Sequence, residues 1–216
     1  LVIRDGNPGL ALATLAAETG ADTVVWNSPR EPDGRETDAE LERQFRRAGI
    51  SVKVWPSAYL FSPDDIRTRE GKPFLVFTPF WNACRAEKPP REPLPAPARL
   101  PFPEITVRSP SLDELGLLPA PDRAEGIRAM WKPGELTAHK VLDEFLATRA
   151  HAYKTDREFP GIHGTSRLSA HLHFGEISPH ALWHRAREAN AVHFLRQLCW
   201  REFASHLLFH YPHTTD

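Results

Sequence analysis

The residues best suited to bind an anion form a short run of hydroxyl groups around one arginine. The run consists of Gly164, Thr165, Ser166, Arg167, Leu168 and Ser169. Hydroxyls, a guanidinium and backbone N–H groups near a helix start are all donors to phosphate oxygens. A surface loop that caps a helix is built from the same residue types. The run alone therefore leaves an anion site and a plain loop open.

A second group lies on one face of an expected helix. Gln197 and Arg201 are four residues apart, and Phe194 lies one turn before Gln197. A ring, an amide and a guanidinium on one stripe could stack on a planar heterocycle and bond to it. Trp200 extends this surface, because aromatic faces are platforms for unstacked bases. The alternative is that Phe194 and Trp200 are core residues and Arg201 a paired helix charge.

The histidines suggest a metal site, which we reject. His206 and His210 have a spacing that can chelate zinc on a helix, but no acidic residue accompanies them as in the metalloprotease motif. His171, His173 and Glu176 lie close in sequence on a segment without helical periodicity. The sequence also lacks a nucleophile elbow, a P-loop and a glycine-rich dinucleotide fingerprint.

The elements that carry these residues are expected to be helices. Apolar residues at spacings of three and four predict helices over 137–153 and 191–210. Ser178 followed by Pro179 predicts an N-cap and first position of a helix that reaches about Glu188.

The N-terminal part instead alternates between helix and strand. The pattern predicts helices over 10–17 and 38–48, followed by strands over 23–26 and 50–55. Helices that end at glycine and lead into short apolar strands indicate a parallel α/β sheet. Two strands are too few to complete an open sheet of this kind. We therefore expect a first strand before Leu1.

Proline and histidine divide the chain. All 11 histidines follow residue 138, whereas 17 of the 21 prolines precede residue 130. Ten prolines lie between Pro89 and Pro121, too many for a helix or a central strand. We therefore predict an α/β domain over 1–83, a proline-rich linker over 84–129 and a helical domain over 130–216.

Composition narrows the classes of function. The 216-residue chain is 41% hydrophobic and has no run of eighteen apolar residues, so we expect a packed core and no membrane span. Its net charge of -1 lacks the basic excess of a general nucleic-acid binder. Any DNA contact would then depend on a local patch and a shaped pocket. The two cysteines lie in unlike segments, which favours a reduced cytoplasmic protein.

Taken together, these segments resemble the DNA photolyase/cryptochrome family, most closely an interior fragment of a bacterial cyclobutane pyrimidine dimer photolyase. The resemblance extends over nearly the whole chain. The motifs follow in family order: Phe77-Thr78-Pro79-Phe80-Trp81, Trp131-Lys132-Pro133-Gly134-Glu135, Tyr153 with Asp156-Arg157, 164–169, 171–179 and Trp200-Arg201-Glu202-Phe203.

The resemblance implies a Rossmann-like α/β antenna domain followed by an all-α FAD-binding domain, both incomplete. The residues that would hold the flavin phosphates are Tyr153, Thr165, Ser166, Arg167, Leu168 and Ser169. Phe194, Gln197 and Arg201 would line the flavin cavity. Gln197, Trp200 and Arg201 would contact the lesion, with Gln197 and Trp200 in the catalytic roles.

The activity implied is that of a deoxyribodipyrimidine photo-lyase. Excited, reduced FAD donates an electron to a pyrimidine dimer flipped out of double-stranded DNA. A cytoplasmic monomer is expected. Glu31 and Pro32 stand where some relatives contact an antenna chromophore, and the loop over 28–37 leaves folate and deazaflavin open.

Two departures from the family pattern affect these expectations. Bacterial enzymes for cyclobutane dimers usually carry glutamate at the place of Gln197, and glutamine there resembles the (6-4) branch. An amide can donate and accept a hydrogen bond but cannot supply a proton. The family's flavin pocket also continues beyond Asp216, so we expect half a cavity and weak or no FAD binding. The alternatives are a cryptochrome-like photoreceptor, a truncated non-catalytic remnant, and a nucleotide-binding α/β protein unrelated to light.

Overall fold

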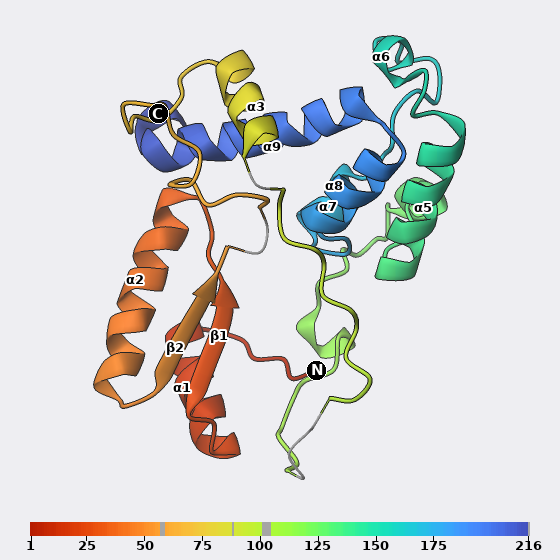
Figure 1. Cartoon of the computed structure of the whole chain (residues 1–216). Helices are drawn as coiled ribbons and strands as arrows, with labels where there is room; N and C mark the ends of the chain where they lie inside the picture. Colours follow the sequence, from red (N-terminus) through yellow and green to blue (C-terminus); the bar gives the residue numbers. More distant parts are fainter. Residues whose placement is uncertain (57–58, 88, 101–104, 216) are drawn as a thin grey trace. The chain divides into compact units, whose positions relative to one another are not determined.

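The computed structural model describes residues 1–56, 59–87, 89–100 and 105–215 (Figure 1). They form two compact units. Of the described residues, those within 1–28, 33–55 and 95–132 form the first unit, and those within 29–32, 56–94 and 133–216 form the second.

These units do not share the boundaries expected from composition. Residues 56–83 group with the helical part of the chain, and residues 95–129 group with the strands. The reason is packing: Phe77, Phe80 and Trp81 are buried in the helical core. In the proline-rich part, Ser109 Oγ accepts a hydrogen bond from the backbone N–H of Ile3 at 2.9 Å. Residues 88 and 101–104 of the predicted linker lie outside the described residues.

The first unit contains a parallel pair of strands, as the sequence predicts. β1 (Thr23–Asn27) and β2 (Ser51–Trp55) pair in parallel, with Thr23 opposite Ser51, and run side by side in Figure 1. The helix α2 (Pro32–Arg47) connects them and starts earlier than expected.

A second helix of this unit, α1 (Pro8–Thr19), is bounded by residues that favour a helix start and a helix end. It begins with a proline, and the Asn7 side chain accepts a hydrogen bond from the Leu10 N–H at 3.0 Å. It ends at Gly20, whose φ of 67° is the left-handed conformation that glycine adopts without strain. The proline-rich part adds a short 3-10 helix, η1 (Asp113–Leu115), and α4 (Glu125–Met130).

The second unit is helical. Its helices are α3 (Phe77–Ala86), α5 (Glu135–Thr148), α6 (Tyr153–Asp156), α7 (Ser169–His173), α8 (Pro179–Glu188), α9 (Val192–His210) and the 3-10 helix η2 (Pro212–Thr215). The predicted N-cap is confirmed, because Ser178 Oγ accepts the Ala181 N–H at 3.0 Å. The single helix predicted over 137–153 is wrong at its end. The Phe145 carbonyl accepts the N–H groups of both Arg149 and Ala150, which closes the last turn of α5.

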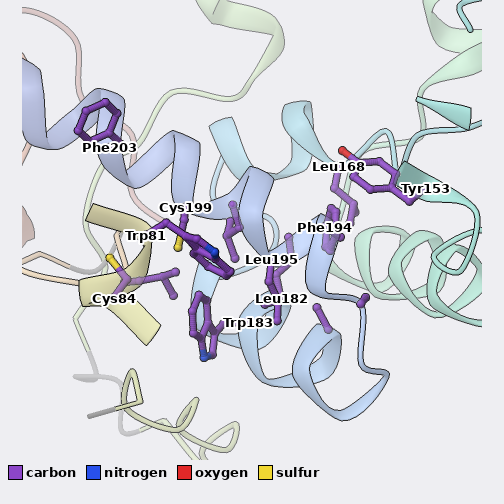
Figure 2. Close-up of a cluster of buried hydrophobic side chains, with 14 of the residues drawn as sticks. Trp81, Cys84, Tyr153, Leu168, Leu182, Trp183, Phe194, Leu195, Cys199 and Phe203 are labelled. Atoms are coloured by element: carbon purple, nitrogen blue, oxygen red, sulfur yellow. The ribbon is translucent and has the colours of Figure 1, made fainter. Parts of the chain in front are cut away.

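The core of this unit is built around α9. This helix packs against α3, α6 and α8. Figure 2 shows its buried side chains, among them Phe194, Leu195 and Cys199, beside side chains of the neighbouring helices. In the part of the chain that the structure describes, no helix is both long and apolar enough to cross a membrane.

Candidate functional site: a cavity lined by α7, α8 and α9

A cavity of about 130 Å³ opens beside α9 in the second unit. Its lining residues are Ser166, Leu168, Ser169, Leu172, Leu182, Phe194, Gln197, Leu198 and Arg201. Six of the ten residues predicted as site residues therefore meet at one place, although two segments far apart in the sequence supply them. The other four, Tyr153, Thr165, Arg167 and Trp200, do not line this cavity.

One wall is the stripe on α9. Phe194, Gln197 and Arg201 follow at spacings of three and four, which places them on one face of a helix. The Phe194 side chain is only 6% exposed, and its ring centre lies 4.9 Å from that of Phe145 and 5.7 Å from that of Tyr153. Figure 2 shows Phe194 and Tyr153 among the buried side chains. Phe194 is thus a core residue and a wall of the cavity at once.

The opposite wall begins in the loop before α7. A side chain at Gly164 would place its Cβ 2.3 Å from the Asp156 carbonyl oxygen, so only glycine allows this approach to α6. Leu168 is 1% exposed and anchors the end of the loop. Between them, Ser166 Oγ accepts the Leu168 N–H at 3.4 Å. The loop thereby brings the hydroxyls of Ser166 and Ser169 to the cavity.

Arg201 brings a positive charge to the cavity, and the buried Glu202 lies beside it. Nη1 of Arg201 lies 3.3 Å from Oε1 of Glu202. Burial raises the pKa of Glu202 to about 7, although Arg201 and the N–H groups of Leu60 and Phe61 act to lower it. The guanidinium also lies over the ring of Tyr59, 4.8 Å from its centre.

The remaining predicted residues lie elsewhere in the second unit. Tyr153 is 8% exposed, and burial raises the pKa of its phenol. Trp200 stacks on Phe77 of α3, with ring centres 3.7 Å apart and planes at 9°. Thr165 and Arg167 are exposed in the loop, and Arg167 has a left-handed φ of 54°. The lesion-binding role of Trp200 stays a prediction.

The sequence did not point to three lining residues, Leu172, Leu182 and Leu198. Leu198 lies four residues after Phe194, so helical spacing could have placed it beside the stripe. Leu172 and Leu182 carry no local indication, because the fold alone brings α7 and α8 to α9.

The histidines that were candidates for metal ligands contact other groups of the protein instead. His206 Nε2 accepts the Phe74 N–H at 3.1 Å, and His210 Nε2 lies 3.2 Å from the Pro63 carbonyl oxygen. His171 Nδ1 lies 2.5 Å from a carboxylate oxygen of Glu176. Among the described residues, no three His, Cys, Asp or Glu side chains gather closely enough to hold a metal ion.

A second cavity of about 250 Å³ lies in the same unit. Its lining residues are Trp81, Cys84, Arg85, Glu87, Pro89, Trp183, Arg187, Val192 and Leu195. Within the described residues, the buried indole N–H of Trp183 has no hydrogen-bond partner. Glu31 and Pro32, expected near an antenna chromophore, do not line it.

The chemistry of the first cavity fits part of a flavin cofactor. Two hydroxyls and a guanidinium suit phosphate oxygens, and an amide beside an aromatic ring suits the edge and face of a heterocycle. The volume of about 130 Å³ is well below the 300–1,000 Å³ typical of pockets for drug-sized ligands. The lining residues therefore suit a flavin cofactor, whereas the enclosed space can hold only a part of that cofactor.

Known proteins resemble this chain over almost its whole length. The family model described as DNA photolyase matches residues 1–98. The deoxyribodipyrimidine photo-lyase of Agrobacterium fabrum is 39% identical over 98% of this chain and 46% of its own length. Cryptochrome-2 of Arabidopsis thaliana is 32% identical over 100% of this chain and 38% of its own length.

Solved structures extend the likeness to the fold. The crystal structure of a bacterial class III photolyase from Agrobacterium tumefaciens superposes with a TM-score of 0.92 at 39% identity, over 98% of this chain and 46% of that one. The chain spans about half the length of the curated relatives it matches. Sequence and fold agree over almost every residue, and the chain belongs to the DNA photolyase/cryptochrome family.

Proposed function

We propose that the protein is a light-dependent photolyase that binds FAD at the cavity beside α9 and acts on pyrimidine dimers in DNA. The observation that carries the proposal is the meeting of Ser166, Ser169, Phe194, Gln197 and Arg201 around one cavity. A flipped dimer as substrate, a monomer and a cytoplasmic location belong to the same proposal. The two free cysteines support the location, because reduced thiols are usual there.

Each cavity residue has a role that its chemistry suggests. The hydroxyls of Ser166 and Ser169 donate hydrogen bonds to anionic oxygens, and Arg201 adds a charge-assisted one. Phe194 and the leucines keep water from the bound ring. Gln197 holds a ring edge or the lesion with its amide, and it moves no proton. When bound, FAD supplies the light absorption and the electron that opens the dimer.

The 250 Å³ cavity is the proposed place of a second chromophore, of which it would enclose only a part, because it too is smaller than the 300–1,000 Å³ typical of pockets for drug-sized ligands. Trp81 and Trp183 offer ring faces for stacking, and Arg85 and Arg187 offer charges for carboxylates. A chromophore of the folate class suits the two rings and the two arginines, whereas Glu87, which also lines the cavity, would oppose its negative charge. Titration with a reduced folate should quench tryptophan fluorescence, and Arg187→Ala should weaken binding. Arg185→Ala is the matched control, because Arg185 is on the same helix and pairs with Asp143 instead. Equal effects of both variants would remove the assignment.

The test of function is light-dependent repair by a chimera. This chain replaces the matching 46% of the Agrobacterium photolyase, so that a complete cavity can form. The chimera is incubated with FAD, a reductant and oligonucleotides that carry a cyclobutane dimer or a (6-4) photoproduct, in light and in darkness. We expect bound FAD and light-dependent repair of the cyclobutane dimer.

Gln197→Glu in the chimera separates the competing interpretations. If glutamine limits cyclobutane repair, the variant should repair faster at the same FAD occupancy. Repair of the (6-4) lesion alone would move the substrate to that branch. Full FAD binding with no repair by either form would favour the cryptochrome-like photoreceptor and contradict the proposal.

A further inference from the structure

Arg201 is held from outside the cavity by a segment distant in sequence. Its guanidinium lies over the ring of Tyr59, 4.8 Å from the ring centre. The guanidinium of Arg30 lies over the same ring at 4.4 Å. Tyr59 is thus a platform shared by two cations, one of which lines the cavity.

Glu202 joins this platform to Arg201. Neighbouring residues of a helix point about 100° apart, yet Glu202 Oε1 and Arg201 Nη1 lie 3.3 Å apart. The other oxygen, Oε2, accepts the backbone N–H groups of Leu60 at 2.9 Å and Phe61 at 3.5 Å. One carboxylate, 4% exposed, therefore contacts both the guanidinium and the segment that carries Tyr59.

Arg30 fixes the same segment from another side. It is 5% exposed, and its Nη2 donates a hydrogen bond to the Phe61 carbonyl at 3.1 Å. The segment 59–61 is thereby bonded at its N–H groups by Glu202 and at a carbonyl by Arg30. A backbone held at both kinds of group is a firm support for the Tyr59 ring.

We propose that Glu202, acting through segment 59–61, is a positioning residue that fixes the Arg201 guanidinium at the cavity wall. The inference rests on the proposed function, in which Arg201 meets an anionic or polar part of FAD. A guanidinium already held by Glu202 and Tyr59 loses little freedom when a ligand binds, which favours affinity. Glu202 itself does not line the cavity.

The ion pair should respond to pH near neutrality. Burial raises the pKa of Glu202 to about 7, so the carboxylate that holds Arg201 forms as pH rises through that value. The groups that face it are Cys199, Arg201 and His206 on α9 and Arg30 on the segment 29–32. Burial lowers the pKa of His206 to about 4, which leaves that ring neutral from pH 6 to 8. FAD affinity should therefore rise over this range.

The first experiment reads the guanidinium of Arg201 directly in the 216-residue chain without ligand. Its Nε–H NMR signal should move with pH around 7 in the wild type and lose that dependence in Glu202→Gln. Glu188→Gln is the matched control, because it removes the same charge from an exposed site on α8. An unchanged Arg201 signal in a folded Glu202→Gln chain would overturn the proposal.

The second experiment is FAD titration of the same variants, placed in the chimera with the Agrobacterium photolyase so that the cavity is complete, at pH 6 and pH 8. Glu202→Gln should lower affinity at pH 8 about tenfold, as expected for one charge-assisted bond, and have little effect at pH 6. Tyr59→Phe should keep the affinity and Tyr59→Leu should reduce it, which tests the platform if Glu202→Gln fails to fold. Equal affinities for all variants at both pH values would contradict the inference.

The two readouts also separate this inference from the proposed function. A pH-dependent Arg201 signal in a chain that binds no FAD would support the positioning and count against the flavin site. FAD binding with an Arg201 signal indifferent to Glu202 would leave the proposed function standing and overturn the positioning.

Discussion

Two single residues, Phe194 and Arg167, show how the cavity and the loop beside it are built. Phe194 is buried, whereas Arg167 is exposed. Phe194 is buried against Phe145 and Tyr153 and still lines the cavity, so its core role and its site role are one arrangement. Arg167 is exposed, and its backbone adopts a left-handed conformation that most side chains avoid. A costly conformation between two cavity serines is the kind of strain that binding loops retain.

Arg167→Gly tests that strain. Glycine adopts a positive φ freely, and the left-handed region costs other residues roughly 1–2 kcal/mol. We expect Arg167→Gly to be about 1 kcal/mol more stable than Arg167→Ala by urea unfolding, while both bind FAD less well than the wild type. A less stable glycine variant would show that the loop is not strained at this residue.

Glu202 should make stability depend on pH in a definite direction. Its pKa rises from 4.5 to about 7 on folding, so the folded state binds the proton more tightly between these values. Stability from this group is present below pH 4.5 and is lost as pH rises to 7. Relative to wild type, Glu202→Gln should therefore gain about 3 kcal/mol between pH 4.5 and pH 7.

His206 and His180 change the stability with pH in the opposite direction to Glu202, so their contribution must be separated from that of Glu202. Burial lowers the pKa of each from 6.5 to about 4, so their contribution is lost as pH falls from 6.5 to 4. The wild type and Glu202→Gln both keep these two histidines. The difference between their unfolding free energies at each pH therefore reports the contribution of Glu202. A difference that stays constant with pH would contradict its raised pKa.

At the scale of elements, local chemistry predicted more of the fold than of the site. The start of α8 followed from Ser178 and Pro179, and the parallel strands followed from apolar runs after glycine. The early end of α5 did not, because no glycine or proline marks it and the closing bonds involve only the backbone. The close approach of Gly164 to α6 also depends on tertiary packing that no spacing reveals.

Gly164→Ala tests whether this approach positions the loop. The added Cβ would lie 2.3 Å from the Asp156 carbonyl, so the loop or α6 must move. We expect a loss of about 1–3 kcal/mol in unfolding free energy, together with weaker FAD binding. Gly161→Ala is the control, because its Cβ would meet nothing within 4 Å. Similar results for both alanines would show that the approach is unimportant.

At the scale of the molecule, composition located a proline-rich part but not the compact units. Contacts of Phe77, Phe80 and Trp81 decide where residues 56–94 belong, and such contacts are not encoded in local composition. The sequence likewise identified the residues of the cavity only as two separate groups. Their meeting depends on how α7, α8 and α9 pack, which a single sequence without a template does not specify.

The two units should also differ in local stability. Among described residues, the buried apolar side chains of the first unit are Ala16 and Phe45, whereas the second unit contains the large cluster around α9. Amide hydrogen exchange should be slowest in α9 and α5 and faster in β1 and β2. Strands that exchange as slowly as α9 would require a core that this burial pattern does not contain.

The most direct test of the proposed flavin site is the NMR spectrum of the ¹⁵N-labelled chain during titration with FAD. The titration extends to about 1 mM, where a ligand bound by only about 4 kcal/mol half-saturates its site. We expect weak binding, with shifts confined to the amides of 166–172, of 194–201 and around Leu182, and reduced in Arg201→Gln but not in Arg196→Gln. Shifts outside these segments would contradict the assignment of the flavin to this cavity.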